Sequence, residues 1–183
     1  YGLAIVCNDD PIIQEILPDI SRPVITYGFN ETADVRISNF KQQGFSSTFT
    51  IQCQQLKPTI NINLNLPGRH NALNATAAAI VTSECCQVDL SSICTALANF
   101  SGVGRRMQRY GEIPIPSGKV LLIDDYGHHP REILVTLQAL RAAWPGRRLV
   151  LAFQPHRYTR TQALFEDFTA TLSTADVLLL MEI

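Results

Sequence analysis

Five short apolar runs constrain the fold of this chain more than any other feature of its sequence. Runs of this length are typical of buried parallel strands, and they are far shorter than the ~20 residues that a membrane-spanning helix needs. In the second half of the chain they alternate with amphipathic helical patterns that begin at Pro130 and Thr159. We therefore expect an α/β protein whose parallel strands are covered by helices. The runs are residues 3–6, 24–27, 120–123, 149–153 and 177–181.

The pattern between residues 33 and 66 is different, because apolar and polar residues alternate there. Residues 60–66 alternate without interruption, which predicts an antiparallel sheet with one exposed face. A Pro–Gly break then precedes an alanine-rich helix over residues 72–83, for which Asn71 is the expected N-cap. We expect the antiparallel strands to form a side sheet of the first α/β domain.

A glycine-containing break at residues 101–104 divides the chain. We predict one domain over residues 1–103 and a second, parallel three-layer α/β domain over residues 104–183. Thr159 and Gln162 have the spacing of a capping box. A helix expected from Ser91 or Ser92 should bury Ile93, Leu97 and Phe100. The helix expected from Pro130 should bury Ile133, Leu134, Leu137, Leu140 and Trp144. The helix expected from Thr159 should bury Leu164, Phe165, Phe168 and Leu172.

Composition and charge exclude several classes of protein. With 46% hydrophobic and 17% charged residues, the chain does not have the composition of a disordered protein. Its formal charge of −1 argues against a nucleic-acid binder, which usually carries a basic field. Five scattered cysteines without a C-x-x-C pair favour reduced thiols in the cytoplasm. Both ends run directly into apolar stretches, so we expect an internal piece of a longer protein.

Polar side chains gather where two of the predicted strands end. Strand 120–123 leads into a loop at 124–130, and strand 149–153 leads into a loop at 154–160. Because ligands of open α/β sheets bind beyond the carboxyl ends of the strands, neighbouring strands would bring both loops to one site. The loops carry acids, imidazoles and guanidiniums that suit an anionic substrate: Asp124, Asp125, Tyr126, His128, His129, His156, Arg157 and Arg160.

Simpler interpretations of these residues stay open. The two aspartates could cap the following helix. His128 and His129 could bind a metal ion together with them, although adjacent histidines rarely converge on one ion. Arg157 and Arg160 could be solvated charges, but cations are unfavourable at a helix N-terminus. A bound carboxylate or phosphate would resolve that conflict.

A third cluster lies in residues 68–74, which read GRHNALN. A turn followed by the start of a helix would explain Asn71 as a cap. It explains neither His70 nor Asn74, because Asn is a poor helix former. Asparagine side chains offer a donor and an acceptor together, which suits the edge of a nucleobase.

Four motifs stand in one order along the chain: GRHNALNA at residues 68–75, GVGRR at 102–106, DDYGHHP at 124–130 and FQPHRYTRT at 153–161. On these motifs the whole chain resembles the Mur ligases of bacterial cell-wall synthesis, and among them the members that add L-alanine. The resemblance implies the later part of a central ATP-binding domain, followed by the first part of a Rossmann-like C-terminal domain. It also implies a cytoplasmic ligase that uses ATP and Mg²⁺ to join L-alanine to the carboxylate of UDP-N-acetylmuramate through an acyl phosphate.

The resemblance also implies roles for individual residues. The nucleotide-binding residues are His70, Asn71 and Asn74 for the adenine, Arg105 and Arg106 for the phosphates, and Asp125 for the ribose. The residues implied to bind the amino acid and the sugar nucleotide are Tyr126, His128, His129, His156, Arg157 and Arg160. Arg106 and His128 are expected to be catalytic, through positioning and charge stabilisation rather than covalent chemistry.

Some parts that such a ligase needs do not occur in this sequence. It has no G-x-x-G-K-[ST] phosphate loop, and no set of Mg²⁺ ligands can be assigned in it. We therefore predict no metal site in these residues and expect this chain to be inactive by itself. Two alternatives stay open, namely a Mur-type ligase for another amino acid or a peptide, and a non-catalytic nucleotide-binding remnant.

Overall fold

The computed structural model describes residues 2–53 and 59–182, and it divides into two compact units, Tyr1–Ser101 and Gly102–Ile183. Each unit has a hydrophobic core of its own. Both units combine strands with helices, which confirms the expected α/β class. Within the described residues, no disulfide joins any of the five cysteines, and none of the helices has the length and apolar character needed to cross a membrane.

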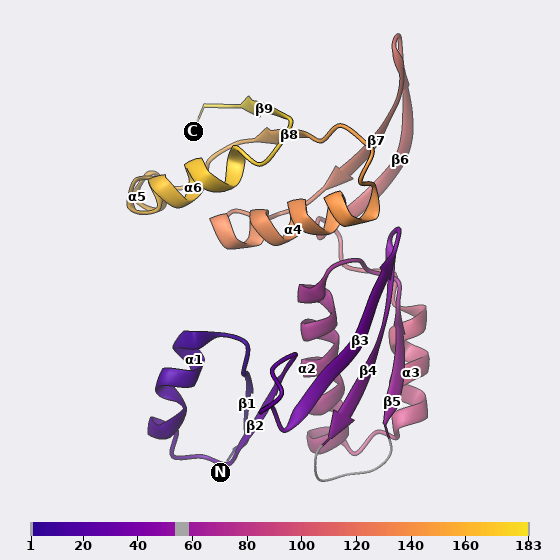
Figure 1. Ribbon diagram of the computed structural model, residues 1–183, viewed down its shortest axis with the longest axis vertical. Helices are drawn as coiled ribbons and strands as arrows, with labels where there is room; N and C mark the ends of the chain where they lie inside the picture. Colours follow the sequence, from indigo (N-terminus) through magenta and orange to yellow (C-terminus); the bar gives the residue numbers. More distant parts are fainter. Residues whose placement is uncertain (1, 54–58, 183) are drawn as a thin grey trace. The chain divides into compact units, whose positions relative to one another are not determined.

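The first unit is built on one five-stranded mixed sheet (Figure 1). In spatial order its strands are β1 (Ala4–Cys7), β2 (Val24–Gly28), β3 (Val35–Gln43), β4 (Ser46–Cys53) and β5 (Ile60–Leu64). β1, β2 and β3 pair in parallel, whereas β3, β4 and β5 pair antiparallel. The carboxyl ends of β1, β2, β3 and β5 therefore lie at the same edge. The expected parallel and antiparallel strands are both confirmed, within a single sheet.

Two helices, α2 (Arg69–Cys86) and α3 (Leu90–Asn99), share one core with this sheet. The alternation in β5 defines the covered face, because Ile62 and Leu64 are buried whereas Asn61 and Asn63 are exposed. The expected exposed face is thereby confirmed. The short helix α1 (Pro11–Ile16) and the 3₁₀ helix η1 (Leu17–Asp19) connect β1 to β2 and contribute no buried residue.

The predicted N-cap of α2 is wrong. α2 begins at Arg69 after Gly68, whose φ of 93° suits glycine and turns the chain into the helix. Asn71 already lies inside the helix, and its Nδ2 donates to the Pro67 carbonyl at 2.8 Å.

α3 begins at Leu90, one or two residues before the expected start at Ser91 or Ser92, and its N-cap is Asp89. The Asp89 carboxylate accepts a hydrogen bond from the Ser92 N–H at 2.9 Å, as an N-cap does. Ile93 is buried as expected, whereas Phe100 follows the end of the helix and is 40% exposed.

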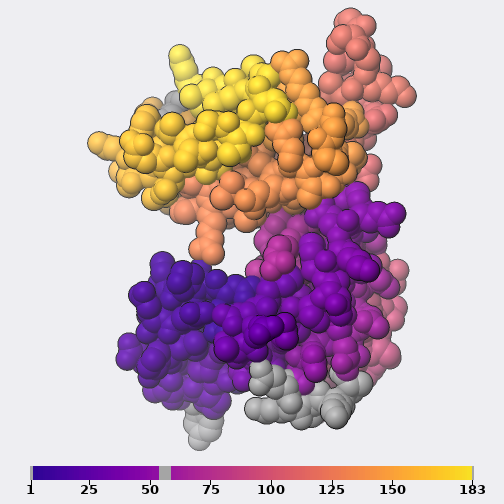
Figure 2. All heavy atoms as spheres, viewed as in Figure 1, coloured from indigo at the N-terminus to yellow at the C-terminus, as the bar shows by residue number. Residues whose placement is uncertain are grey.

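The second unit contains a hairpin and a pair of parallel strands. The hairpin, which projects from the unit in Figure 2, consists of β6 (Gln108–Ile115) and β7 (Gly118–Asp124). It is followed by α4 (Pro130–Ala143), β8 (Val150–Phe153), α5 (Tyr158–Ala163), α6 (Phe165–Leu172) and β9 (Val177–Leu180). β8 and β9 pair in parallel. The core consists of Ile133, Leu137, Phe153, Phe168 and Leu172.

Within the described residues, the parallel sheet expected for residues 104–183 contains β8 and β9 but not β7. Within the described residues β7 pairs with β6 and β8 pairs with β9. A cavity of about 670 Å³, lined mainly by aliphatic side chains, lies between β7, α4 and β8. The sequence pattern did not predict β6, because Gly111, at φ 88°, lies at a shift in register and interrupts the apolar alternation.

The helix expected from Thr159 is in fact two short helices. The N-cap of α5 is Arg157, at φ 72°. α5 ends at Ala163, and the backbone leaves the helical region at Leu164, before α6 begins. Phe165, expected to be buried, is 61% exposed, whereas Phe168 and Leu172 are buried as expected. In α4 the expected start at Pro130 is confirmed, and Ile133 and Leu137 are buried, but Leu134, Leu140 and Trp144 are only partly buried.

Candidate functional site

Asp125 fixes the shape of the loop between β7 and α4. Its Oδ2 accepts a hydrogen bond from the Met107 N–H at 2.9 Å, and its Oδ1 accepts one from the Gly127 N–H at 2.8 Å. Met107 is 3% exposed and has a φ of 48°, a region that non-glycine residues seldom occupy. A Cβ at residue 127 would lie 2.8 Å from Oδ1, so a larger residue there would displace the Asp125 carboxylate. One carboxylate thus fixes both the loop and the segment before β6.

Two arginines from the GVGRR motif lie beside Tyr126. The guanidinium carbons of Arg105 and Arg106 are 4.8 Å and 6.0 Å from the centroid of its ring. The Tyr126 N–H donates to the Arg105 carbonyl at 2.7 Å, and Arg105 Nε is 3.6 Å from Asp124 Oδ2. The structure therefore brings the GVGRR and DDYGHHP motifs together. Two guanidiniums beside one exposed ring are groups that can bind a phosphate or a carboxylate, and the carboxylates of Asp124 and Glu132 lie next to them.

The ring of His128 is oriented by its own loop. His128 Nδ1 lies 3.1 Å from the Tyr126 carbonyl, and the two rings make an edge contact at 5.4 Å. Since a carbonyl only accepts hydrogen bonds, this contact assigns a proton to Nδ1 and leaves Nε2 as the acceptor of the neutral ring. His129 has a different local role, because its Nδ1 accepts the Arg131 N–H at 3.3 Å at the start of α4.

Glu132, on the first turn of α4, contacts several of these residues. Its Oε2 accepts hydrogen bonds from the N–H groups of His128 and His129 at 3.0 Å and 3.3 Å. Oε2 also lies 3.5 Å from His128 Nδ1, and Oε1 lies 3.9 Å from Arg106 Nη1. Burial works to raise the pKa of Glu132, but these hydrogen bonds and the neighbouring positive charges outweigh it, so the pKa is lowered. The carboxylate is therefore ionised at neutral pH.

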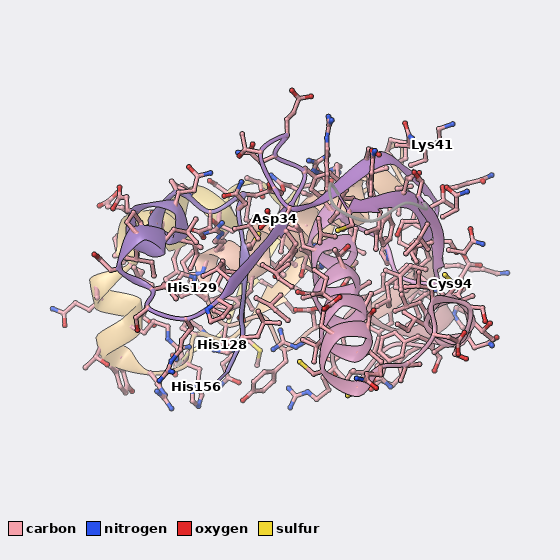
Figure 3. The ribbon with its side chains drawn as sticks, turned by 90° about the horizontal axis from the view of Figure 1, so that it is seen from below. Asp34, Lys41, Cys94, His128, His129 and His156 are labelled. Carbon is pink, nitrogen blue, oxygen red and sulfur yellow. The ribbon has the colours of Figure 1, made fainter. Side chains whose placement is uncertain are left out.

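α5, which follows β8, contacts the loop after β7 through Arg160. Its Nη1 donates to the His128 carbonyl at 3.3 Å, although the two strands are not paired. In Figure 3, His156 lies in the same part of the view as His128 and His129. The side chains of His156 and Arg157 are exposed, and within the described residues neither makes a side-chain polar contact with the loop 124–129.

The third predicted cluster lies at the carboxyl edge of the first unit's sheet. The Gly68 N–H donates to Gln42 Oε1, at the end of β3, at 2.9 Å. The guanidinium carbon of Arg69 lies 3.5 Å from the centroid of the Phe29 ring, just beyond β2. Asn74 is exposed, and it stands four residues beyond His70 and three beyond Asn71, so the three residues share one side of α2.

Sequence reasoning missed two acidic residues of these sites. Asp9 follows β1, and its carboxylate accepts the N–H groups of Phe29 and Asn30 at 2.9 Å and 2.8 Å, which fixes the loop after β2. Its position three residues beyond the apolar run 3–6 was the available signal. Glu132 forms a capping box with His129. That signal was hidden because histidine is not one of the usual N-cap residues.

Two family models match this chain. The Mur ligase middle domain matches residues 1–82, and the Mur ligase glutamate ligase domain matches residues 105–182. Together they cover most of both units, in the order that the four motifs predict. The chain belongs to the Mur ligase family. This Mur ligase chain has a middle domain followed by a C-terminal glutamate ligase domain, which confirms the resemblance at the level of the family.

Solved Mur ligases have the same fold. The UDP-N-acetylmuramate-alanine ligase of Thermotoga maritima is 24% identical, with a TM-score of 0.65 over 87% of this chain and 39% of that one. MurF of Thermotoga maritima, solved with ADP, is 18% identical, with a TM-score of 0.69 over 99% and 40%. A murein peptide ligase of Psychrobacter arcticus is 19% identical, with a TM-score of 0.66 over 100% and 44%. The chain spans less than half the length of each of these proteins.

Proposed function

We propose that this Mur ligase chain is part of an ATP-dependent ligase that joins L-alanine to the carboxylate of UDP-N-acetylmuramate, in the cytoplasmic synthesis of peptidoglycan precursors. The observation that carries the proposal is the 3.3 Å contact between Arg160 and the His128 carbonyl. It joins the DDYGHHP and FQPHRYTRT loops, on which the resemblance to the alanine-adding members rests. The likeness to the alanine ligase of Thermotoga maritima supports the shared fold.

The proposed reaction must first turn a carboxylate into an electrophile. A carboxylate resists attack because oxide is a poor leaving group, and ATP supplies the phosphoryl group that converts it into an acyl phosphate. The amine of L-alanine then forms a bond to the acyl carbon, inorganic phosphate leaves from the tetrahedral intermediate, and the amine loses a proton. Negative charge develops throughout on phosphate and carbonyl oxygens, so fixed positive side chains lower the barrier.

The second unit supplies such side chains, and we assign their roles accordingly. Arg105 and Arg106 beside Tyr126 bind the nucleotide phosphates, and Asp125, in the loop after β7, contacts the ribose. His128, with its Nε2 available as an acceptor when the ring is neutral, faces the reacting groups. The substrate-binding group consists of Tyr126, His128, His129, His156, Arg157 and Arg160. Arg106 and His128 act by positioning and charge stabilisation, without a covalent intermediate on the protein.

The first unit supplies the adenine contacts in this proposal. His70, Asn71 and Asn74 lie on one side of α2, where it begins at the carboxyl edge of the sheet. Ligands of open α/β sheets bind at this edge, and amide side chains can pair with both donors and acceptors of a base. We place the functional boundary between residues 103 and 104, so that the adenine contacts belong to residues 1–103 and the substrate contacts to residues 104–183.

Mg²⁺ is not assigned to this part of the protein. Within the described residues, no group of three or more His, Cys, Asp or Glu side chains could hold a metal ion. The residues present therefore do not fit the Mg²⁺ that phosphoryl transfer from ATP usually employs. The roles proposed for this chain are accordingly those of its side chains alone.

The substrate assignment is tested with the full-length protein. We expect ADP release in the presence of UDP-N-acetylmuramate and L-alanine, and a product whose mass equals the sum of the two substrates minus one water. Glycine, L-serine and the peptides of peptidoglycan should give much lower rates. Equal rates with glycine and L-alanine would contradict the amino-acid assignment. Release of ADP only with a peptide would favour a peptide ligase, and no release with any acceptor would favour a non-catalytic remnant.

A further inference from the structure

We propose that Glu132 is a positioning residue, which holds Arg106 and His128 in the geometry that the proposed ligase reaction requires. The inference rests on the proposed function for its chemistry. Its structural basis does not depend on that function, because it consists of the contacts that Arg106 and His128 make with the Glu132 carboxylate. Oε1 of Glu132 lies 3.9 Å from Arg106 Nη1, and Oε2 lies 3.5 Å from His128 Nδ1.

Glu132 makes more contacts than the cap of a helix needs. A capping-box glutamate normally accepts one hydrogen bond, from the N–H of the N-cap residue. Glu132 accepts that N–H, from His129 at 3.3 Å, and also the N–H of His128 at 3.0 Å. Its two oxygens then also contact two side chains that belong to different motifs. The additional contacts all involve the loop 124–129 or the segment before β6.

The contacts of Glu132 connect residues that are distant in sequence. Arg106 precedes the hairpin β6–β7, whereas His128 follows it. A third group, the Arg160 guanidinium, donates to the His128 carbonyl from α5. Glu132 therefore sits where three segments of the second unit converge, and its charge is opposite to that of the arginines. Loss of that charge should free Arg106 while the backbone of the loop stays in place.

The small contribution of the Glu132 ion pair to stability allows its positioning role to be tested separately from its role in folding. The side chains of Arg106 and Glu132 are 51% and 37% exposed, so the ion pair itself contributes little to stability. Glutamine also serves in capping boxes, since its side-chain oxygen can accept the same N–H groups. The Glu132→Gln variant thus keeps the cap of α4 and removes only the negative charge. A residue that merely capped the helix would tolerate this change.

The test compares Glu132→Gln with Glu166→Gln in the full-length protein. Glu166 is an exposed glutamate in the first turn of α6, so the control makes the same chemical change at the start of another helix. We expect Glu132→Gln to retain the wild-type Tm and to lower kcat at least tenfold. The KM for L-alanine should change less than threefold. Glu166→Gln should match the wild type in all three quantities, and Glu132→Asp, which keeps the charge, should recover part of the lost kcat.

The outcomes distinguish this inference from the proposed function. Wild-type kcat in Glu132→Gln, in an assay in which the wild type turns over, would overturn the positioning role alone. If the wild type is inactive with every acceptor, the proposed function fails, and a crystal structure of Glu132→Gln tests the inference by itself. We expect α4 to begin at Pro130 as before, with the Arg106 guanidinium moved away from residue 132. An unmoved Arg106 and His128 would overturn it.

Discussion

The carboxylate of Asp125 accepts the N–H of Met107 at 2.9 Å, and this hydrogen bond ties the segment before β6 to the loop after β7. The same carboxylate accepts the Gly127 N–H at 2.8 Å. We expect Asp125→Ala to lower the free energy of unfolding by about 1–3 kcal/mol, because two partly buried N–H groups lose their acceptor. Chemical denaturation of the variant and the wild type measures the difference.

Asp124→Ala is the matched control for that prediction. Asp124 lies next in the chain, but its carboxylate makes an exposed ion pair, with Oδ2 3.6 Å from Arg105 Nε. Exposed pairs contribute about 0–1 kcal/mol, so this variant should stay close to the wild type. Equal losses of stability in the two variants would show that Asp125 does not brace the loop and the segment before β6.

The sequence predicted the first unit well because its signals are local. Residues 60–66 alternate at every position, and the structure shows Ile62 buried beside exposed Asn61 and Asn63. A strand with one covered face leaves this pattern in the sequence wherever it occurs. The order of the strands in the sheet also follows the chain order, so no long-range pairing had to be inferred.

The second unit was harder to predict because its decisive contacts are not local. β6 carries a bulge at Tyr110, between Arg109 and Gly111, which interrupts the alternation that identifies a strand. The sequence therefore did not indicate that β6 pairs with β7, and we predicted a parallel sheet for the second unit instead. In the candidate site, the residue types of the loops indicated anionic chemistry. The contact between Glu132 and Arg106 forms because the β6–β7 hairpin brings the start of α4 back to the segment before β6. No local sequence pattern predicts such a contact.

Asp176 gives the second unit a pH-dependent stability. Its pKa is lowered from 3.8 to about 2, first by hydrogen bonds from Arg141 and then by the Leu149 N–H. Because the folded state has the lower pKa, ionised Asp176 stabilises the fold above pH about 4, and this contribution is lost as the pH falls towards 2. Asp176→Asn should remove this component of the acid dependence.

The measurement for Asp176 is the free energy of unfolding at about pH 6 and about pH 3, on both sides of the unfolded-state pKa. The difference between the two pH values should be smaller in Asp176→Asn than in the wild type. Asp167→Asn removes one exposed negative charge from the first turn of α6 and serves as the charge control. An undiminished difference in Asp176→Asn would contradict the stabilising role of the Arg141 pair.

Asn71 and Asn74 should respond differently to the same substitution. Asn71→Ala removes the hydrogen bond to the Pro67 carbonyl, so we expect a loss of about 0.5–1.5 kcal/mol in the free energy of unfolding. Asn74 is exposed, and Asn74→Ala should leave stability unchanged within about 0.5 kcal/mol. If Asn74 contacts the adenine, the same variant should weaken ATP binding about fivefold, which corresponds to roughly 1 kcal/mol. Calorimetric titration of the full-length protein with ATP decides this, and unchanged affinity would remove Asn74 from the site.

Arg160 offers the most direct test of the substrate-binding group. Its Nη1 donates to the His128 carbonyl at 3.3 Å, so the guanidinium is held near the loop 124–129. We expect Arg160→Ala to lower kcat/KM for L-alanine. The decrease should correspond to a loss of about 1.5–3 kcal/mol in transition-state stabilisation, because a lost hydrogen bond to a charged group costs that much. The KM for ATP should stay within about twofold of the wild type, a difference of less than 1 kcal/mol.

Arg22→Ala, which removes an exposed arginine of the first unit, controls for the loss of charge. Unchanged kinetics for L-alanine in Arg160→Ala would exclude Arg160 from the substrate site, and an equal loss in Arg22→Ala would attribute the effect to net charge.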